Sequence, residues 1–213
     1  MDLKELESGV NPKTHWYYQS KKIPLIAFVK KVFSENKVPL TIIDVGSGSG
    51  FFMYELHQQI PEMISKIYLV DIGYTNDEVA ETKNQIIEKI TSLPDKIENG
   101  IVVMMDVLEH LEDDKAMLMV IKEKAKGENY FFITVPAFKN LWSGHDIFLG
   151  HYRRYTLETL GDLLQACSYK IDSLHYIFGF IFPIVWITRR LSNKTTNPKS
   201  DMKPLHPVLN RTL

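Results

Sequence analysis

Short apolar runs alternate with longer amphipathic runs along most of the chain, and this alternation predicts parallel strands joined by crossover helices. The predicted strands are residues 40–45, 66–71, 86–91, 101–106, 130–135 and 169–176. The predicted helices are residues 17–35, 51–56, 76–85, 113–126 and 157–166. We therefore expect a doubly wound α/β fold with a mostly parallel sheet.

Two of the segments admit another interpretation, and a third is an unusually long loop. Pro24 lies inside the first predicted helix and suggests a break or a second start at that point. Residues 86–91 fit the end of a helix as well as a strand, and we assign them to a strand. Residues 136–154 form a long predicted loop, and a loop of this length inside a compact domain is usually functional.

The most informative stretch is residues 40–50, with the sequence LTIIDVGSGSG. Its glycines, Gly46, Gly48 and Gly50, can take positive φ and let the backbone approach a ligand at the N-terminus of the next helix. A dinucleotide-binding turn of the G-x-G-x-x-G type needs glycine where this chain has Phe51. The pattern therefore predicts a nucleotide-binding turn of a different type.

Carboxylates and a histidine follow the ends of several predicted strands. Asp44 ends the first strand, Asp71 the second and Asp106 the fourth, with Glu109 and His110 just behind it. Each aspartate alone would be an ordinary turn or capping residue. Ligands of such sheets bind at the carboxyl ends of the strands, so the coincidence predicts a ligand site there. A carboxylate after the second strand can accept both ribose hydroxyls, which is the role we expect for Asp71.

The G-x-G-x-G turn with Asp44 ahead of it resembles motif I of the class I S-adenosylmethionine-dependent methyltransferases. Residues 105–111, MDVLEHL, are similar to the D-x-L-E-H signature of many small-molecule members. Further segments, including L-W-S-G-H-D and L-G-H-Y-R-R-Y-T, resemble a bacterial and archaeal subgroup that we associate with cell-surface polysaccharide or lipid-linked glycan genes. They are residues 15–18, 135–138, 141–146 and 149–156.

The resemblance implies a Rossmann-like domain that transfers the sulfonium methyl group of S-adenosylmethionine to a small-molecule, glycan or lipid-linked acceptor. Asp44 would orient the glycine loop or meet the cationic end of the methionine moiety. The residues implied in cofactor binding are Asp44, Gly46, Ser47, Gly48, Gly50, Asp71, Ile72, Ser92, Leu93, Asp106, Val107 and His110.

Two departures from the family pattern change these expectations. Many relatives carry an acidic residue after the third strand that binds the adenine amino group, whereas this chain has Thr91–Pro94 there. Adenine would then be held by backbone, hydroxyl or apolar contacts. Relatives also usually end in an antiparallel strand, but residues 192–213 are polar and loop-like. We expect a sheet without that strand, through truncation or by nature, and a mobile tail.

On the acceptor side, methyl transfer needs alignment, and a base only when the acceptor loses a proton. The candidate bases are His145, then His110, then His151. The residues expected to contact the acceptor are Trp16, Tyr17, His145, Arg153, Arg154 and Tyr155. No metal is expected, because the D-x-L-E-H run lacks a second ligand pair at helical spacing.

Two of these groups have an alternative role. Arg153 and Arg154 either grip a phosphate or carboxylate of the acceptor, or one of them pairs with Asp146 or Glu158 and holds the loop closed while the other is solvated. The aromatic residues 16–18 form either a lid or the packed face of an N-terminal helix.

Length and composition fit one catalytic domain, since 213 residues with 45% hydrophobic content can bury one sizeable core. The formal charge of -1 gives no bias toward nucleic acid, and the single cysteine, Cys167, excludes a disulfide framework. We expect one methyltransferase domain, residues 1–191, followed by the tail. Its parts are a helical cap (1–36), a core (37–176) and an apolar helix (177–191).

The apolar residues 176–187 are too few to span a membrane, which takes about 20. A helix here, with the basic residues that follow, could lie in a membrane interface through residues 176–190 and suit a lipid-linked acceptor. The alternative is a buried core or dimer helix. The N-terminus has no apolar signal region, so we expect a cytoplasmic enzyme, at the inner face of the membrane if lipid is contacted.

Two rival functions use the same features. An NAD-dependent oxidoreductase would bind its cofactor at the same edge, but Phe51 and the D-x-L-E-H run argue against it. A non-catalytic cofactor-binding scaffold would keep Asp44 and Asp71 and would be excluded by turnover. The sequence leaves the acceptor, the methylated atom and the oligomeric state open.

Overall fold

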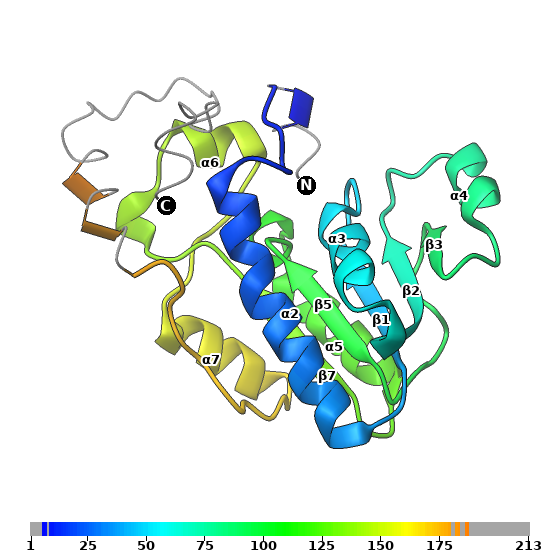
Figure 1. Ribbon diagram of the computed structural model, residues 1–213. Coiled ribbons are helices and arrows are strands. Elements are labelled where there is room, and N and C mark those ends of the chain that lie inside the picture. Colours follow the sequence, from blue (N-terminus) through cyan, green and yellow to red (C-terminus); the bar gives the residue numbers. More distant parts are fainter. Residues whose placement is uncertain (1–5, 8, 180–181, 184–185, 188–213) are drawn as a thin grey trace. The chain divides into compact units, whose positions relative to one another are not determined.

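The computed structural model describes residues 6–7, 9–179, 182–183 and 186–187 (Figure 1). The chain divides into two compact units. In the described part, the first unit holds the residues up to 105 together with 124–134, and the second holds 106–123 and the residues from 135 onward. In the described part, the chain therefore passes from the first unit into the second, returns to the first once, and then enters the second again.

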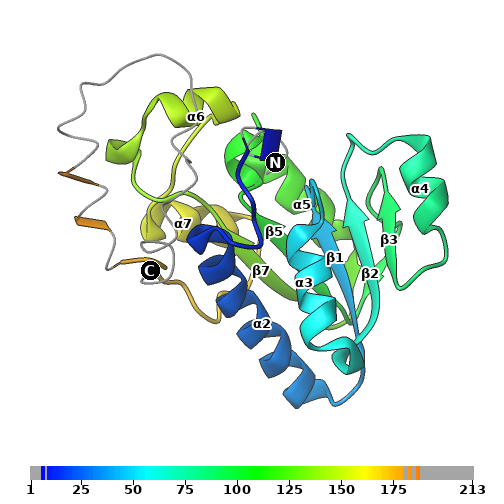
Figure 2. The ribbon, with the colours of Figure 1, turned by 45° about the horizontal axis from the view of Figure 1, so that its top comes forward.

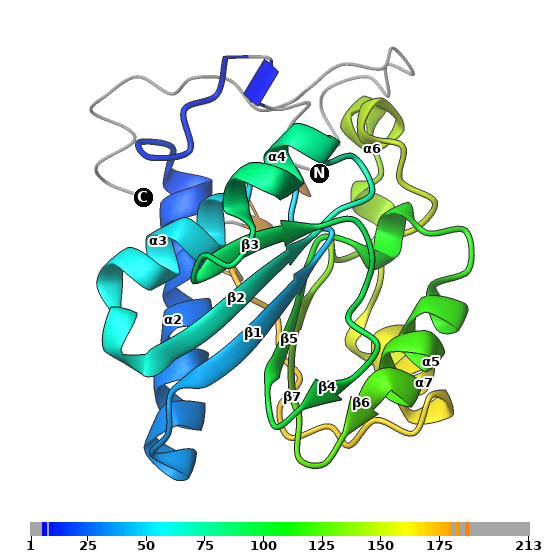
Figure 3. The same cartoon turned by 90° about the vertical axis from the view of Figure 1, so that its right-hand side faces the viewer.

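The first unit is built on a sheet of five parallel strands (Figures 1 and 3). The strands are β1 (Leu40–Val45), β2 (Ile64–Val70), β3 (Ile87–Ile90), β5 (Ile101–Met105) and β7 (Tyr130–Thr134). Their order is β3-β2-β1-β5-β7, so the direction of winding reverses between β1 and β5. Every strand pairing in the described part is parallel. This arrangement confirms the predicted doubly wound fold, whose ligands bind at such a reversal.

Two helices, α2 (Trp16–Asn36) and α3 (Phe51–Gln59), lie on one face of this sheet (Figure 2). Almost all residues of β1 and β5 are buried. Strands that are covered on both faces need apolar side chains on both, which is why these two are nearly continuous apolar runs. The core shared by helices and strands consists of Leu25, Val29, Val32, Leu40, Ile42, Met53, Leu56, Ile60, Ile64, Ile67, Leu69, Ile101, Val103 and Met105. This core fixes the start of α3 directly after the turn that leaves β1.

α2 continues through Pro24, so the prediction of a break or a second start there is wrong. A proline inside a helix costs about 3 kcal/mol, because it removes a hydrogen bond and crowds the preceding turn. The buried face of α2, which includes Leu25, Val29 and Val32, packs into the core and offsets this cost.

At the edge of the sheet formed by β3, the bounds of the elements differ slightly from the prediction. η1 (Pro61–Met63) joins α3 to β2. α4 (Asn76–Thr82) begins with a capping box formed by Thr75 and Glu78 and ends three residues before the predicted end. The ambiguous segment 86–91 contributes β3 and is a strand, as predicted.

The second unit is mainly helical. Its elements are η2 (Leu108–His110), α5 (Asp114–Lys124, whose last residue belongs to the first unit), η3 (Lys139–Leu141), α6 (Gly144–Leu149) and α7 (Leu157–Ala166). The predicted loop 136–154 therefore contains two short helices. α6 forms because Ser143 and Asp146 make a capping box at its N-terminus. A six-residue helix is too short to show an apolar periodicity in the sequence.

The strand predicted at residues 169–176 is not present, and that prediction is wrong. Tyr169 is buried, and its hydroxyl donates to the carbonyl of Leu118 in α5 at 2.8 Å. Most of residues 170–176 are exposed. The apolar pattern there reflects the packing of Tyr169 against α5, not pairing with another strand.

The apolar segment 176–187 is described in part, and its residues 182–183 and 186–187 are helical. Tyr176, Phe182 and Trp186 are between 36% and 40% exposed. The rest of the helix predicted at 177–191 and the tail predicted at 192–213 lie outside the described residues. Among the helices that the structure describes, each is too short or too polar to cross a membrane.

One asparagine ties together the amino ends of β5 and β7. The side-chain oxygen of Asn129 accepts a hydrogen bond from the backbone of Gly100 at 2.9 Å. Its amide nitrogen donates to the carbonyl of Lys126 at 2.7 Å and to that of Ile97 at 3.3 Å. Ile97 and Lys126 belong to β4 (Ile97–Glu98) and β6 (Ala125–Lys126), which form a separate two-stranded sheet.

We predict that Asn129→Ala lowers the free energy of unfolding by about 1–3 kcal/mol, because the buried N–H of Gly100 loses its acceptor. Urea unfolding measures this loss. Asn140→Ala, at an exposed position of η3, is the control and should leave the midpoint unchanged. Equal midpoints for the two variants would contradict the role given to Asn129.

Candidate functional site

The glycine turn after β1 has the backbone that the sequence predicts. Gly46, Gly48 and Gly50 have φ values of 68°, 53° and 73°, in the left-handed region that favours glycine. A Cβ on Gly50 would also lie 2.7 Å from Cδ1 of Leu69 in β2. Backbone conformation and close packing therefore both require glycine at position 50.

The turn is held to the end of β2 by hydrogen bonds. The N–H groups of Gly46 and Ser47 donate to the carbonyl of Val70, at 2.8 and 3.2 Å. Asp71 accepts the N–H of Gly48 on Oδ2 and that of Gly73 on Oδ1, both at 2.9 Å. Each carboxylate oxygen keeps a second lone pair, so Asp71 can still accept ribose hydroxyls, as predicted for it.

Tyr74 is a part of this turn that the sequence analysis missed. Its hydroxyl lies 2.8 Å from both the carbonyl of Gly48 and Oγ of Ser47. Burial raises the pKa of Tyr74 and keeps the hydroxyl protonated. The only signal in the sequence is an aromatic residue shortly after Asp71, and a single tyrosine in a turn has no distinctive pattern.

The other predicted cofactor residues of the first unit differ widely in exposure. Asp44 is buried in β1. Ile72, next to Asp71, is 94% exposed, which is unusual for a large apolar side chain. After β3, Ser92 is exposed and Leu93 is half-buried. Ile72 and Leu93 thus offer apolar surface at the ends of two neighbouring strands.

The aromatic residues at the start of α2 pack against α3. Tyr18 is buried, with its ring edge-on to Phe51 at 5.7 Å and stacked on Phe52 at 5.8 Å. Trp16 and Tyr17 are half-buried beside it. Of the two roles considered for this segment, the position of Tyr18 favours the packed face of a helix.

In the second unit, the residues after β5 form a tight turn. Asp106 has a φ of 58° and is half-exposed, and aspartate tolerates this left-handed conformation better than most residues. Val107 and Glu109 are buried, Glu109 completely, and His110 is half-buried. The turn therefore carries three polar side chains of different exposure within five residues of chain.

A buried carboxylate, Asp146, organises the loop before α7. Its Oδ2 accepts the N–H of Ser143 at 2.8 Å, as the capping box requires. Its Oδ1 lies 2.9 Å from Nδ1 of His151 and accepts Nε of Arg154 at 2.6 Å. Burial alone would raise the pKa of Asp146, but the bonds from His151 and Arg154 outweigh it and hold the pKa well below the usual range.

The paired arginines bind carboxylates of the second unit. Arg154 pairs with Asp146, which is one of the two roles considered for it. Arg153 pairs with Asp114 at 2.9 Å, and the hydroxyl of Tyr155 donates to the same carboxylate at 2.7 Å. Burial raises the pKa of Tyr155. Glu158 is not the partner of either arginine, and these ion pairs hold the loop in place.

Two of the three candidate bases lie together. The rings of His110 and His151 are edge-on, with centroids 4.5 Å apart. One nitrogen of each ring and one carboxylate oxygen of Glu109 lie within 4.8 Å of one another. His145 is buried in the first turn of α6, where its N–H donates to Ser143 Oγ. This geometry favours His110 and His151 over His145 as candidate bases.

The parallel sheet and the glycine turn at its switch point define a doubly wound α/β domain that binds a nucleotide-type cofactor. A family profile described as a methyltransferase domain matches residues 16–174, and the chain belongs to this family. The comparison with curated proteins found no match.

Solved structures share the fold. A Burkholderia thailandensis 1,6-didemethyltoxoflavin-N1-methyltransferase, bound to 1,6-didemethyltoxoflavin and S-adenosylhomocysteine, is 17% identical with a TM-score of 0.52, over 74% of this chain and 72% of that chain. LepI in complex with SAM is 16% identical with a TM-score of 0.52, over 70% and 43%. An O-methyltransferase family protein from Burkholderia thailandensis is 14% identical with a TM-score of 0.51, over 75% and 53%.

The protein is thus an enzyme of the class I methyltransferases, and its cofactor is S-adenosylmethionine. Membership of this family argues against the alternative of an NAD-dependent oxidoreductase. The subgroup suggested by the loop motifs and the nature of the acceptor are separate questions, because a likeness at this level of identity concerns the fold.

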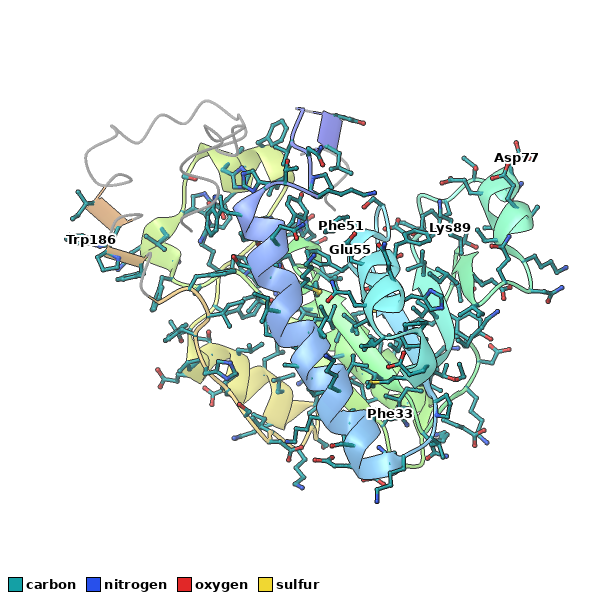
Figure 4. The ribbon with its side chains drawn as sticks, in the orientation of Figure 1. Phe33, Phe51, Glu55, Asp77, Lys89 and Trp186 are labelled. Carbon is teal, nitrogen blue, oxygen red and sulfur yellow. The ribbon has the colours of Figure 1, made fainter. Side chains whose placement is uncertain are left out.

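We predict that Asp71→Ala greatly weakens cofactor binding, because the N–H of Gly48 loses its acceptor and the end of β2 loses the carboxylate expected to accept ribose hydroxyls. S-adenosylhomocysteine at about 100 times its Kd should add about 2.7 kcal/mol and raise the Tm of the unsubstituted protein by about 5–10 °C. NADH should give no shift. Asp77→Ala, at an exposed position of α4 (Figure 4), is the control and should keep the full shift. A full shift in the Asp71 variant would contradict this role.

We also predict that Asp146→Asn destabilises the protein by about 3 kcal/mol at neutral pH, because Arg154 stays buried without its anionic partner. A carboxyl whose pKa falls on folding adds stability above its ordinary value, 3.8, and this stability disappears as the pH falls through the lower folded value. Urea unfolding below about pH 4 should therefore be less pH-dependent in the variant than in the parent. Asp162→Asn, exposed on α7, should match the parent at every pH.

Proposed function

We propose that this methyltransferase acts on a hydroxyl group of a small polar molecule or glycan, so that the acceptor loses a proton during transfer. The observation that carries the proposal is the cluster of His110, His151 and Glu109 in the second unit, with His151 held by Asp146. A sulfonium methyl group needs no further activation, whereas a hydroxyl must be deprotonated to become a strong nucleophile.

For the cofactor, we propose that the first unit supplies most of the contacts. Asp71 would accept the ribose hydroxyls, and the glycine turn, residues 46–50, would approach the methionine moiety with its backbone. Ile72, exposed beside Asp71, and Leu93 would cover the adenine, which fits the lack of a carboxylate at residues 91–94. The remaining residues proposed here are Asp44, Ser47, Ser92, Asp106, Val107 and His110.

For the acceptor, the ion pairs argue against a strongly acidic substrate. Arg153 and Arg154 are bound to Asp114 and Asp146, and an acidic group would have to displace these carboxylates. We therefore propose that both arginines hold the loop. Trp16, Tyr17, His145 and Tyr155 remain proposed acceptor-side residues, with the aromatic rings suited to the apolar faces of a sugar or phenol.

A lipid-linked acceptor is a second candidate, favoured by the apolar segment 176–187. Tyr176 and Phe182 pack on Phe138, with ring centroids 4.6 and 4.9 Å away, and are still more than a third exposed. Trp186 and Ile187 are also exposed, at 38% and 48%. Such a surface, at the inner face of the membrane, would suit a lipid carrier.

The test is the formation of S-adenosylhomocysteine with three acceptor classes: a phenol series, neutral oligosaccharides and a glycolipid in vesicles. We predict turnover with a hydroxyl acceptor and a loss of about 100-fold or more in kcat for His151→Gln, with an unchanged Kd for S-adenosylhomocysteine. His175→Gln, exposed and far along the chain from the cluster, is the matched control. An active His151 variant would contradict the proposal, and turnover confined to glycolipid would favour the second candidate.

A further inference from the structure

Glu109, His110 and His151 bring one carboxylate and two imidazoles into a single cluster of the second unit. One ligand atom from each lies within 4.8 Å of the others. We propose that these three residues bind a divalent first-row metal ion such as Mn²⁺, Fe²⁺ or Zn²⁺. Ligands about 2.1 Å from one ion lie about 3.0–3.4 Å from each other in octahedral or tetrahedral geometry, so side-chain rotations would be enough to close the site.

The orientation of His151 suits a ligand. Its Nδ1 is bound to Asp146 at 2.9 Å, so Nε2 is the nitrogen available to the ion. A carboxylate behind a ligating histidine is the arrangement that fixes the tautomer and raises the basicity of the imidazole. Asp146 is itself held by Ser143 and Arg154, so the support of His151 extends over two further residues.

The two segments that carry the ligands are joined directly. The N–H of Tyr152, next to His151, donates to the carbonyl of Glu109 at 2.7 Å. This bond places the residue after one ligand against the backbone of another. The site is thus part of the folded loop and does not depend on flexible surface side chains.

The ligand types indicate which ions would bind. Neutral imidazoles suit first-row transition metals, whereas Mg²⁺ and Ca²⁺ prefer oxygen ligands throughout. Three protein ligands leave at least one coordination position for water or substrate, as in catalytic sites. The fully buried carboxylate of Glu109 would contribute a negative charge close to the ion.

This inference rests on the proposed function for its chemical role. The ion would bind the acceptor oxygen and lower the pKa of its hydroxyl, whose proton passes to water. The resulting oxyanion attacks the methyl carbon, the C–O bond forms as the C–S bond breaks, and S-adenosylhomocysteine leaves as a neutral thioether. The ion, positioned by three residues, would take the place of a single histidine base.

The sequence predicts no metal because the D-x-L-E-H run lacks a second ligand pair at helical spacing. Glu109 and His110 are adjacent in the chain, whereas His151 lies near the end of the predicted loop 136–154, about 40 residues later. Only the folded loop around Asp146 brings the third ligand to the first two. This is why the D-x-L-E-H run alone gave no metal signal.

The experiment is a titration of the 213-residue chain with Mn²⁺, followed by electron paramagnetic resonance of the free ion, without cofactor or acceptor. We expect one Mn²⁺ per chain. His110→Gln, His151→Gln and Glu109→Gln should each weaken binding by about 100-fold, and His175→Gln should bind like the parent. The Tm of each variant without ligand shows which variants are folded, and His110→Gln, at a half-buried position, decides the result if the others unfold.

Two results would overturn the metal site: no stoichiometric Mn²⁺ binding by the parent, or parent-like binding by a folded His110 variant. Because binding is read without turnover, either result leaves the hydroxyl acceptor untouched. Conversely, tight Mn²⁺ binding by a protein that methylates no hydroxyl would retain the site and remove its proposed role.

Discussion

A buried negative charge must be compensated, and the second unit is arranged around this requirement at Asp146. The carboxylate collects the backbone of Ser143, the ring of His151 and the guanidinium of Arg154 from different parts of one loop. Each of these bonds also fixes something else: the start of α6, the tautomer of a histidine, or the path of the chain before α7. The loop thereby becomes an ordered framework.

In the first unit, the main constraint is that a ligand must come close to the ends of the strands. Three glycines with positive φ remove side chains from the turn, and the β2 end supplies the atoms that hold the bare backbone in place. Asp71 and Tyr74 bind both sides of Gly48, one through its N–H and one through its carbonyl. The flexibility that glycine brings is thus restrained by two neighbouring side chains.

Features with a local cause could be predicted from the sequence. The glycine turn, the carboxylate after β2 and the five parallel strands each depend on residues close together in the chain. Features that depend on distant partners were missed or misassigned. Pro24 remains helical because of the core beneath it, and residues 169–176 are not a strand because Tyr169 bonds to α5. α6 was missed for another reason, since its capping box is local but the helix is too short to show periodicity. The pairing of Arg153 with Asp114 and the meeting of His110 with His151 also depend on distant partners, whereas the pairing of Arg154 with Asp146 was one of the two roles considered from the sequence.

The exposure of Ile72 has a thermodynamic consequence. A side chain of this size gains about 1.5–3 kcal/mol when it is fully covered, and in the free protein nearly all of its surface faces water. A ligand that covers it releases this hydration, which makes the heat capacity change of binding negative. The enthalpy of such a complex becomes more favourable on warming, and its apparent driving force shifts from entropy to enthalpy, although no contact in the complex has changed.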